Sequence, residues 1–121
     1  MSLATRVADL IQYIQTGRIL DAMTEFYAPD AVMQENNSAP TVGLAANLER
    51  EKQFLAFVKE WKSLSITATA VNEATGHAFI QYHFVFIGTD GKTYTYDQVS
   101  AQTWKNNKIT LEKFYYDTAA K

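Results

Sequence analysis

The hydrophobic period of this chain changes once, near Leu64, and no other feature of the sequence constrains its fold as strongly. Before Leu64, apolar residues recur at intervals of three and four, the spacing of amphipathic helices. After it, apolar and polar residues alternate, as in Leu64, Ile66 and Ala68, which is the spacing of half-buried strands. Helices followed by strands indicate an α+β fold with segregated layers.

Three helices are predicted in the first half. Ser2 is a suitable N-cap for the first, and Gly17 is expected to end it, because glycine takes the left-handed cap conformation without steric cost. A shorter second helix ends before Pro29 and leads into an extended segment over residues 31–35. The longest helix is expected over residues 43–61. Its charged side is interpreted as solvent-facing, and consists of Glu49, Arg50, Glu51 and Lys52.

Four strands are predicted after the helices, as an antiparallel meander over residues 64–71, 77–87, 93–104 and 109–116. A Gly-Thr-Asp-Gly turn and an Asn-Asn turn join the last three strands. Long twisted strands coil, so the expected architecture is three N-terminal helices packed in the concave face of a strongly curved antiparallel sheet. With neither repeats nor a linker, residues 1–121 are expected to form a single domain.

Composition excludes several classes of function. The chain has no cysteine, and therefore neither a disulfide framework nor a cysteine nucleophile. Its net charge of −2 disfavours a nucleic-acid partner. The apolar runs are too short to span a bilayer, and no residue spacing is typical of a metal site. We expect a soluble cytoplasmic protein without a membrane segment, a metal or a cofactor.

Three short segments carry a family resemblance: residues 26–32, which read Phe-Tyr-Ala-Pro-Asp-Ala-Val, the hairpin at residues 104–109, and the Phe-Tyr-Tyr-Asp ending at residues 114–117. The chain resembles the cone-shaped α+β family, with a cystatin-like fold, that includes ketosteroid isomerases, SnoaL-like polyketide cyclases and nuclear transport factor 2 (NTF2-like proteins). This resemblance implies a deep conical pocket between the concave face of the sheet and the helices.

The resemblance also assigns four positions. The base of the isomerases falls on Glu35, and a position that is often histidine in the cyclases falls on Glu112. The isomerases' oxyanion tyrosine falls near Leu10 and their buried acid falls on Ser100. Leucine cannot donate a hydrogen bond, and serine is a weaker donor than a carboxylic acid. Two of the four positions therefore lack the chemistry that the isomerases use.

Glu35 and Glu112 are the predicted catalytic residues. Glu35 shares a strand face with Ala31 and Met33, so it is expected to point inward, where partial desolvation suits a general base. Glu112 shares a face with Phe114 and could pair with Glu35 as acid and base. The alternatives are a solvated glutamate at the pocket rim for Glu35 and a surface glutamate paired with a lysine for Glu112.

Aromatic residues are concentrated on the longest helix and on the sheet, and most of them are expected to form the core. A pocket lined by aromatic rings with a few polar groups is also typical of small-molecule sites. The expected partner is thus an apolar or aromatic small molecule. The predicted ligand-binding residues are Phe54, Phe57, Trp61, Tyr96, Gln98, Ser100 and Tyr116.

Two functions remain open at this point. The first is a small-molecule-binding protein that catalyses a proton transfer such as an isomerisation, cyclisation or dehydration. The second is a non-catalytic module that uses the cone to bind ligands or to dimerise. The fold does not choose between them. A cavity shared by Glu35 and Glu112 favours the first, whereas a cavity filled by aromatic rings favours the second.

The outer face of the sheet predicts a homodimer. If the glycine-rich turn closes its hairpin symmetrically, His83 lies opposite Asp97, as a proton-handling pair or as an ordinary cross-strand pair. The same register places Phe79, Val85 and other partly apolar side chains on the outside. This mixture is typical of an interface, so a homodimer through the sheet is expected.

Overall fold

The structure is a computed structural model that describes residues 2–117, and it contains the three predicted helices. They are α1 (Leu3–Gln15), α2 (Ile19–Phe26) and α3 (Leu44–Phe57). Six strands complete the fold: β1 (Tyr27–Glu35), β2 (Thr41–Val42), β3 (Val58–Asn72), β4 (His77–Gly88), β5 (Thr93–Lys105) and β6 (Lys108–Tyr116). The α+β class is confirmed. Within residues 2–117, no helix combines the length and apolarity that crossing a membrane requires.

Helix α1 begins and ends where the sequence indicates. The Ser2 hydroxyl accepts a hydrogen bond from the Thr5 amide at 3.1 Å. The Glu73 carboxylate, from the β3–β4 turn, accepts from the Leu3 and Ala4 amides, each at 3.0 Å. Gly17 then adopts a φ of 79°, a left-handed conformation that stops the helix at little cost.

Helix α3 is shorter than predicted. It ends at Phe57, and residues 58–61 belong to strand β3, with Trp61 opposite Phe86 of β4. Strand β4 extends to Gly88 and offers its backbone hydrogen-bonding groups to this segment, which favours a strand there. Two register shifts interrupt this part of the β3–β4 ladder. The prediction of a helix over residues 58–61 was therefore wrong.

The sheet has the order β2-β1-β6-β5-β4-β3. Strands β3 to β6 form the predicted antiparallel meander. Strand β1 corresponds to the predicted extended segment but is longer, and it pairs in parallel with β6, so the sheet is mixed. Parallel neighbours need a long connection, here supplied by everything between β1 and β6. The sequence did not place this pair, because its two strands are far apart along the chain.

The β4–β5 hairpin has the symmetric register, with His83 opposite Asp97. The Asn-Asn turn also forms as predicted: Asn106 and Asn107 have φ values of 53° and 64°. These local turns fix which side chains face inward along β4 and β5. The alternation then places Tyr82, Phe84 and Phe86 toward the helices.

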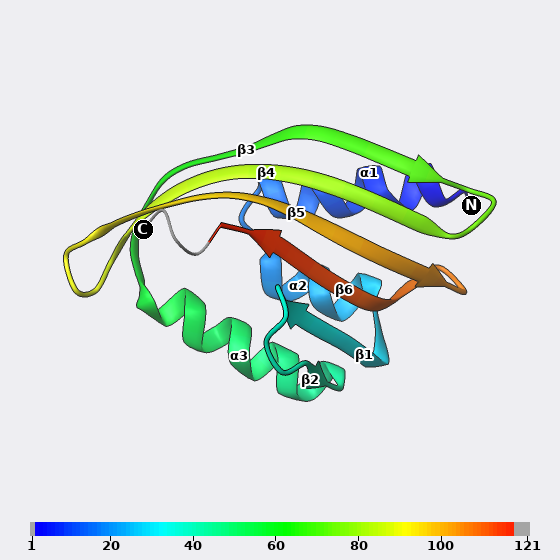
Figure 1. The fold of residues 1–121 in the computed structure, drawn as a ribbon, viewed down its shortest axis with the longest axis horizontal. Coiled ribbons are helices and arrows are strands. Elements are labelled where there is room, and N and C mark those ends of the chain that lie inside the picture. The colour runs from blue at the N-terminus through cyan, green and yellow to red at the C-terminus, as the bar shows by residue number, and fades with distance from the viewer. Residues whose placement is uncertain (1, 118–121) are drawn as a thin grey trace.

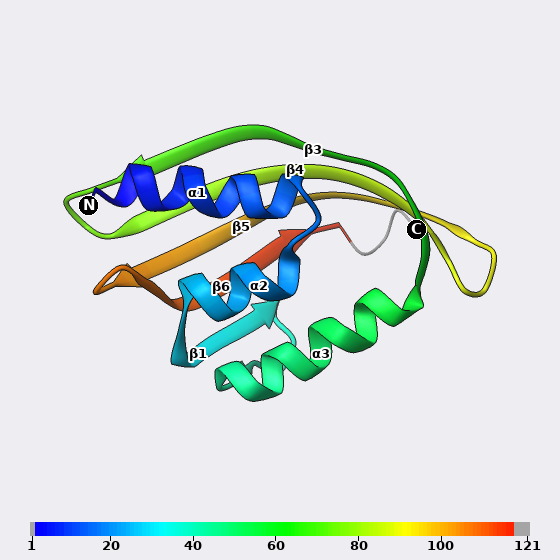
Figure 2. The same ribbon diagram turned by 180° about the vertical axis from the view of Figure 1, so that it is seen from behind.

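The helices lie on one side of the curved sheet, as the two ribbon views show (Figures 1 and 2). Figure 2 shows α1 and α2 in front of the strands, whereas α3 runs beside β1 and leads into β3. The long strands β3, β4 and β5 arch over this helical layer (Figure 1). The concave face of the sheet thus faces the helices, and in residues 2–117 no helix covers its convex face.

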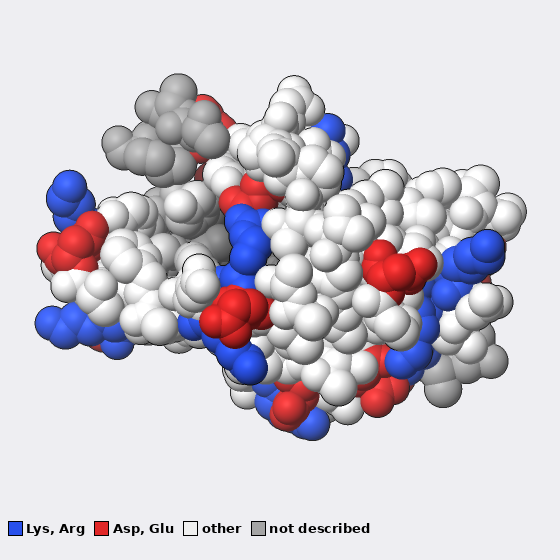
Figure 3. Space-filling model, turned by 90° about the horizontal axis from the view of Figure 1, so that it is seen from below, with Lys and Arg blue, Asp and Glu red and all other residues white. Residues whose placement is uncertain are grey.

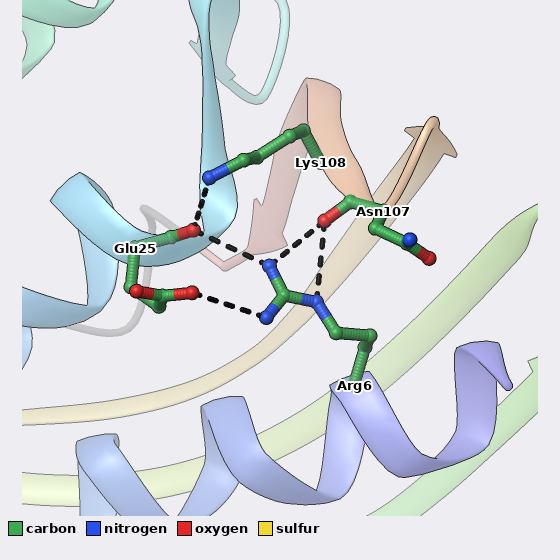
Figure 4. A network of polar contacts seen from close by, with 4 residues as sticks. All are labelled: Arg6, Glu25, Asn107 and Lys108. Carbon is green, nitrogen blue, oxygen red and sulfur yellow. Dashed lines mark hydrogen bonds and ion pairs between the residues drawn. The ribbon is translucent and has the colours of Figure 1, made fainter. Parts of the chain in front are cut away.

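One arginine joins the two N-terminal helices to the β5–β6 turn (Figure 4). The Arg6 guanidinium donates to the Asn107 carbonyl from Nη2 at 2.9 Å and from Nε at 3.2 Å. It also contacts the Glu25 carboxylate at 3.2 Å and lies 4.3 Å from the centre of the Phe26 ring. Lys108 donates to the Glu25 carbonyl at 2.6 Å. Cations suit this position, because carbonyls in the last helical turn lack partners in the helix.

Candidate functional site

A cavity of about 330 Å³ lies between the concave face of the sheet and the three helices. Aliphatic side chains of α1 and α2, among them Leu10, Ile14 and Met23, close one part of it. Aromatic rings form another wall, contributed by Phe54, Trp61, Phe84 and Tyr96. This volume falls near the lower end of the range typical of small-molecule sites. The cavity is therefore not filled by the aromatic rings that surround it.

Glu112 of β6 lines this cavity and is buried, with 1% of its surface exposed. Its Oε1 accepts a hydrogen bond from the Tyr27 hydroxyl. Its Oε2 accepts from the Ser100 hydroxyl at 2.5 Å and from the Gln102 amide at 3.0 Å. Strand β6 therefore presents a carboxylate that three donors from β1 and β5 hold in place. The surface alternative for Glu112 is excluded.

Trp104 fixes the direction of these hydrogen bonds. Its indole Nε1 donates to the Gln102 side-chain oxygen at 2.9 Å. Because an indole N–H can only donate, the amide oxygen of Gln102 must face Trp104. The amide nitrogen then faces Ser100 Oγ at 3.2 Å and the Glu112 carboxylate. Ser100 and Gln102 of β5 thus form a buried network with Glu112 and Trp104.

Burial raises the pKa of Glu112, and the hydrogen bonds from Ser100, Tyr27 and Gln102 oppose that rise. Burial also raises the pKa of Tyr27 well above its usual value, with a further contribution from the neighbouring Glu112 charge. Tyr27 thus stays a hydroxyl donor toward Glu112. The network can stabilise Glu112 as a carboxylate, while burial favours its protonated form.

Glu35 lies at the rim of the same cavity, at the end of β1, with 42% of its side chain exposed. Its Oε2 is 3.1 Å from Arg50 Nη2, and its Oε1 accepts from the Tyr116 hydroxyl at 2.5 Å. Burial, followed by the bond to Glu35, raises the pKa of Tyr116. The parallel β1–β6 pairing places Glu35 opposite Phe114, two residues beyond Glu112. Both predicted catalytic carboxylates therefore line one cavity.

Glu51 is a third carboxylate of the cavity, and the sequence reading missed it. It is half-buried and lines the cavity, so its assignment to a solvent-facing side of α3 was wrong. Burial, followed by the charges of Glu112 and Glu35, raises its pKa to about 7. A signal was present: Asn47, Glu51 and Phe54 are spaced four and three apart, on one face of a helix.

The predicted ligand-binding residues divide into two groups. Five of them line the cavity: Phe54, Trp61, Tyr96, Gln98 and Tyr116. Phe57 instead packs against Phe86 and Tyr94, with ring centres 6.3 and 5.5 Å away. Ser100 is fully buried and donates a hydrogen bond to Glu112 without lining the cavity itself. Direct contact of Phe57 and Ser100 with a ligand is therefore not supported by their positions.

His83 and Asp97 lie outside the cavity, on the convex face of the sheet. Their Nδ1 and Oδ1 atoms are 2.7 Å apart, and 40% and 80% of their side chains are exposed. The pair therefore belongs to the outer face rather than to the cavity. Among residues 2–117, no three side chains of His, Cys, Asp or Glu gather as a metal site. On the face seen in Figure 3, acidic and basic side chains are interspersed.

A family model described as a SnoaL-like domain matches residues 7–112. A solved SnoaL-like protein from Mesorhizobium loti, a proposed polyketide cyclase, is 26% identical, with a TM-score of 0.83 and 96% and 100% of the two chains covered.

A proposed isomerase from Bacillus subtilis is 12% identical, with a TM-score of 0.82 and coverage of 98% and 91%. TerC, co-crystallised with polyporic acid, is 14% identical, with a TM-score of 0.79 and coverage of 98% and 93%. No curated protein matches the sequence.

Proposed function

The chain belongs to the SnoaL-like domain family, and we propose that it binds an apolar, ring-containing small molecule in its cavity and moves a proton on that molecule. The reaction class is isomerisation, cyclisation or dehydration. The observation that carries this proposal is the arrangement of Glu35 and Glu112, which enter one cavity from the neighbouring strands β1 and β6. Two carboxylates in different environments can divide the roles of acid and base.

The surroundings of the two carboxylates support different roles. Glu112 is buried, and burial favours its protonated form, so it is proposed as the acid. Glu35 lies at the rim, positioned by Arg50 and Tyr116, and is proposed as the base. Phe54, Trp61 and Tyr96 offer flat apolar surface to the ligand's ring. Co-crystallisation of the neighbour TerC with polyporic acid also supports a small-molecule ligand.

Binding is tested by thermal shift with steroids, aromatic polyketides and short fatty acids, against sugars and nucleotides. We expect ring-containing apolar compounds to raise the melting temperature, because the cavity wall is largely aromatic and aliphatic. Stabilisation by sugars or nucleotides alone would contradict the proposed ligand class.

Proton transfer is tested with a β,γ-unsaturated ketone whose conjugation is followed by ultraviolet absorbance. Glu35→Gln and Glu112→Gln are each expected to lower the rate about 10²- to 10⁴-fold, the usual contribution of an acid or base. Glu49→Gln is the matched control, since Glu49 is exposed on α3 and does not line the cavity. Binding without turnover, in the wild type and all variants, would favour the non-catalytic alternative.

The same fold is also proposed to form a homodimer through the convex face of the sheet. Three large apolar side chains are exposed there: Phe79, Leu111 and Tyr115, at 44%, 41% and 49%. The register places Phe79 opposite Ala101 and Tyr115 opposite Val99, so apolar groups from β4, β5 and β6 lie near one another, with Lys113 between Leu111 and Tyr115. Such a patch, bordered by His83 and Asp97, has the composition of an ordinary interface.

Sedimentation equilibrium tests the dimer at micromolar concentration. Val85→Lys places a charge in the middle of the convex face and is expected to dissociate the dimer. Val42→Lys is the control, because Val42 is 68% exposed on the edge strand β2. A monomeric wild type, or a dimer that Val85→Lys leaves intact, would exclude this interface.

A further inference from the structure

Some polar side chains of the cavity already have hydrogen-bond or ion-pair partners in the protein, and others do not. Glu35 and Glu112 are held by the partners described above, and Arg50 contacts Glu35 and the Thr41 hydroxyl, at 3.1 and 3.0 Å. Within residues 2–117, the side chains of Glu51, Tyr82 and Gln98 line the cavity and form no hydrogen bond or ion pair with the protein. Unsatisfied polar groups of this kind are where a ligand's polar atoms bind.

The ionisable groups that line the cavity are mostly acidic. Three carboxylates line it, Glu35, Glu51 and Glu112, against one guanidinium, that of Arg50, among the described residues. Arg50 already pairs with Glu35. A group that enters the space beside Glu51 therefore meets the ionised Glu51 carboxylate, which has no paired cation among the described residues, together with the faces of aromatic rings. Both attract a cation.

We infer that the cavity takes an apolar amine, whose ammonium group binds the Glu51 carboxylate and whose ring lies against the aromatic wall. This inference rests on the proposed function, since it names the class of ring-containing molecule that the cavity binds. Tyr82 supplies a second acceptor through its hydroxyl oxygen, and the side-chain oxygen of Gln98 a third. Trp61, Phe84 and Tyr96 surround the apolar part of the ligand.

The titratable and charged groups that act on Glu51 come from four elements. They are Glu112 of β6, Glu35 and Tyr27 of β1, Tyr82 of β4 and Arg50 of α3 itself. Without a ligand, burial and the two carboxylates favour the protonated form of Glu51, with a pKa of about 7. An ammonium group supplies the positive charge that the proton supplies in the empty cavity. Binding should therefore expel that proton to solvent.

Whether a ligand releases or takes up a proton on binding distinguishes an amine from a neutral ligand. At pH 6, about nine-tenths of Glu51 is protonated, so an amine should release about 0.9 proton on binding, and at pH 8 only about 0.1. Its affinity should rise about tenfold between these pH values. A neutral ligand that accepts a hydrogen bond from protonated Glu51 would instead take up a proton at pH 8 and bind more weakly there.

Isothermal titration calorimetry in two buffers of different ionisation enthalpy measures this proton count. The probes are naphthylethylamine, which stays charged up to pH 8, and its neutral isostere naphthylethanol. In the wild type we expect the amine to bind more tightly than the alcohol at pH 8 and to release a proton at pH 6. Glu51→Gln should abolish the release and weaken amine binding about tenfold at pH 8, while leaving alcohol binding unchanged. Glu49→Gln, at an exposed site of the same helix, should change neither the proton release nor the affinity for the amine.

The outcomes distinguish failure of this inference alone from failure of the proposed function. If the alcohol binds and the amine binds no more tightly and releases no proton, the inference fails and the apolar ligand class stands. Proton release that persists in Glu51→Gln would assign the ammonium to another carboxylate and would also overturn it. If neither probe binds at either pH, the ring-binding cavity and the inference fail together. Circular dichroism establishes that Glu51→Gln is folded, as expected for a side chain that forms no hydrogen bond or ion pair in the described chain.

Discussion

At the scale of single residues, three glutamates of one cavity differ because their neighbours differ. Glu112 has three donors and almost no exposure, and Glu35 has an arginine and a tyrosine at the rim. Glu51 has only burial and the repulsion of the other two carboxylates, which Arg50 partly offsets. Removing a carboxylate without partners relieves a cost, whereas removing a satisfied one leaves donors unpaired. The three are therefore expected to respond differently to the same substitution.

Glu51→Gln is predicted to change how stability depends on pH. The pKa of Glu51 in the folded protein is about 7, above the ordinary 4.5, so between these pH values the folded state binds more protons than the unfolded state. This glutamate therefore lowers the free energy of unfolding as pH rises from about 4.5 to about 7. The variant should gain about 1–2 kcal/mol relative to wild type between pH 5 and pH 8, a value reduced for partial exposure.

Urea unfolding of the two proteins at pH 5 and pH 8 measures this difference. Glu49→Gln, at an exposed site of the same helix, should show no such change. Equal pH dependence in wild type and Glu51→Gln would mean that Glu51 titrates normally.

At the scale of elements, the packing of the N-terminal helices on the sheet depends on contacts between segments that are distant in sequence. Helices α1 and α2 meet the β5–β6 turn through Arg6, whose side chain is 11% exposed (Figure 4). Its guanidinium satisfies the Asn107 carbonyl and contacts both the carboxylate and the carbonyl of Glu25. A planar fork with several donors can make these contacts at once, which a lysine cannot.

Arg6→Met is predicted to destabilise the protein by about 2–3 kcal/mol. Methionine has an apolar stem of similar length but removes the guanidinium from the Phe26 ring and leaves the Asn107 carbonyl without its charged donor. The matched control is Arg18→Met, because Arg18 is 52% exposed and pairs with an exposed Asp21. Arg18→Met should lower the free energy of unfolding by no more than about 0.5 kcal/mol. Thermal and urea unfolding compare the two, and equal losses would show that Arg6 does not join these elements.

At the scale of the whole molecule, the curved sheet and the helices enclose a space that their side chains do not fill. Aromatic rings pack with one another along the wall, for example Phe84 with Tyr96 at 5.1 Å and Phe54 with Phe86 at 5.4 Å between centres. The side chains around an empty cavity lack such contacts, which lowers the free energy of unfolding. This cost favours a role for the cavity in binding a ligand.

Ala22→Leu is predicted to stabilise the protein and to abolish ligand binding. Ala22 is 2% exposed and lines the cavity, so a larger side chain occupies the space without new exposed surface. We expect the melting temperature to rise by about 4 °C, corresponding to about 1 kcal/mol for a domain of this size, and the ligand-induced thermal shift to disappear. Ala56→Leu, on the exposed side of α3, should leave the ligand response intact. A lower melting temperature, or a retained ligand response in Ala22→Leu, would contradict this role of the cavity.

Local features of the fold could be predicted from the sequence, because each depends on residues that are close along the chain. The change of period at Leu64 separates helices from strands, and the alternation along β4 and β5 gives their inner and outer faces. The glycine-rich turn sets the register that places His83 opposite Asp97. The Asn-Asn turn similarly begins β6. The membership of Glu35 and Glu112 in one cavity could be anticipated through the resemblance, although Glu112 is buried and Glu35 lies at the rim.

Contacts between distant segments were decided by the tertiary structure alone. The parallel β1–β6 pair joins residues about eighty positions apart, and the end of α3 depends on β4 as a partner for residues 58–61. The hydrogen-bond partners of Glu112 and the raised pKa of Glu51 come from other elements in the same way. Periodicity identifies the apolar side of an element, but it carries no information about what lies opposite. The chemistry of a carboxylate depends on those opposing groups and on its distance from water, and both are properties of the folded chain.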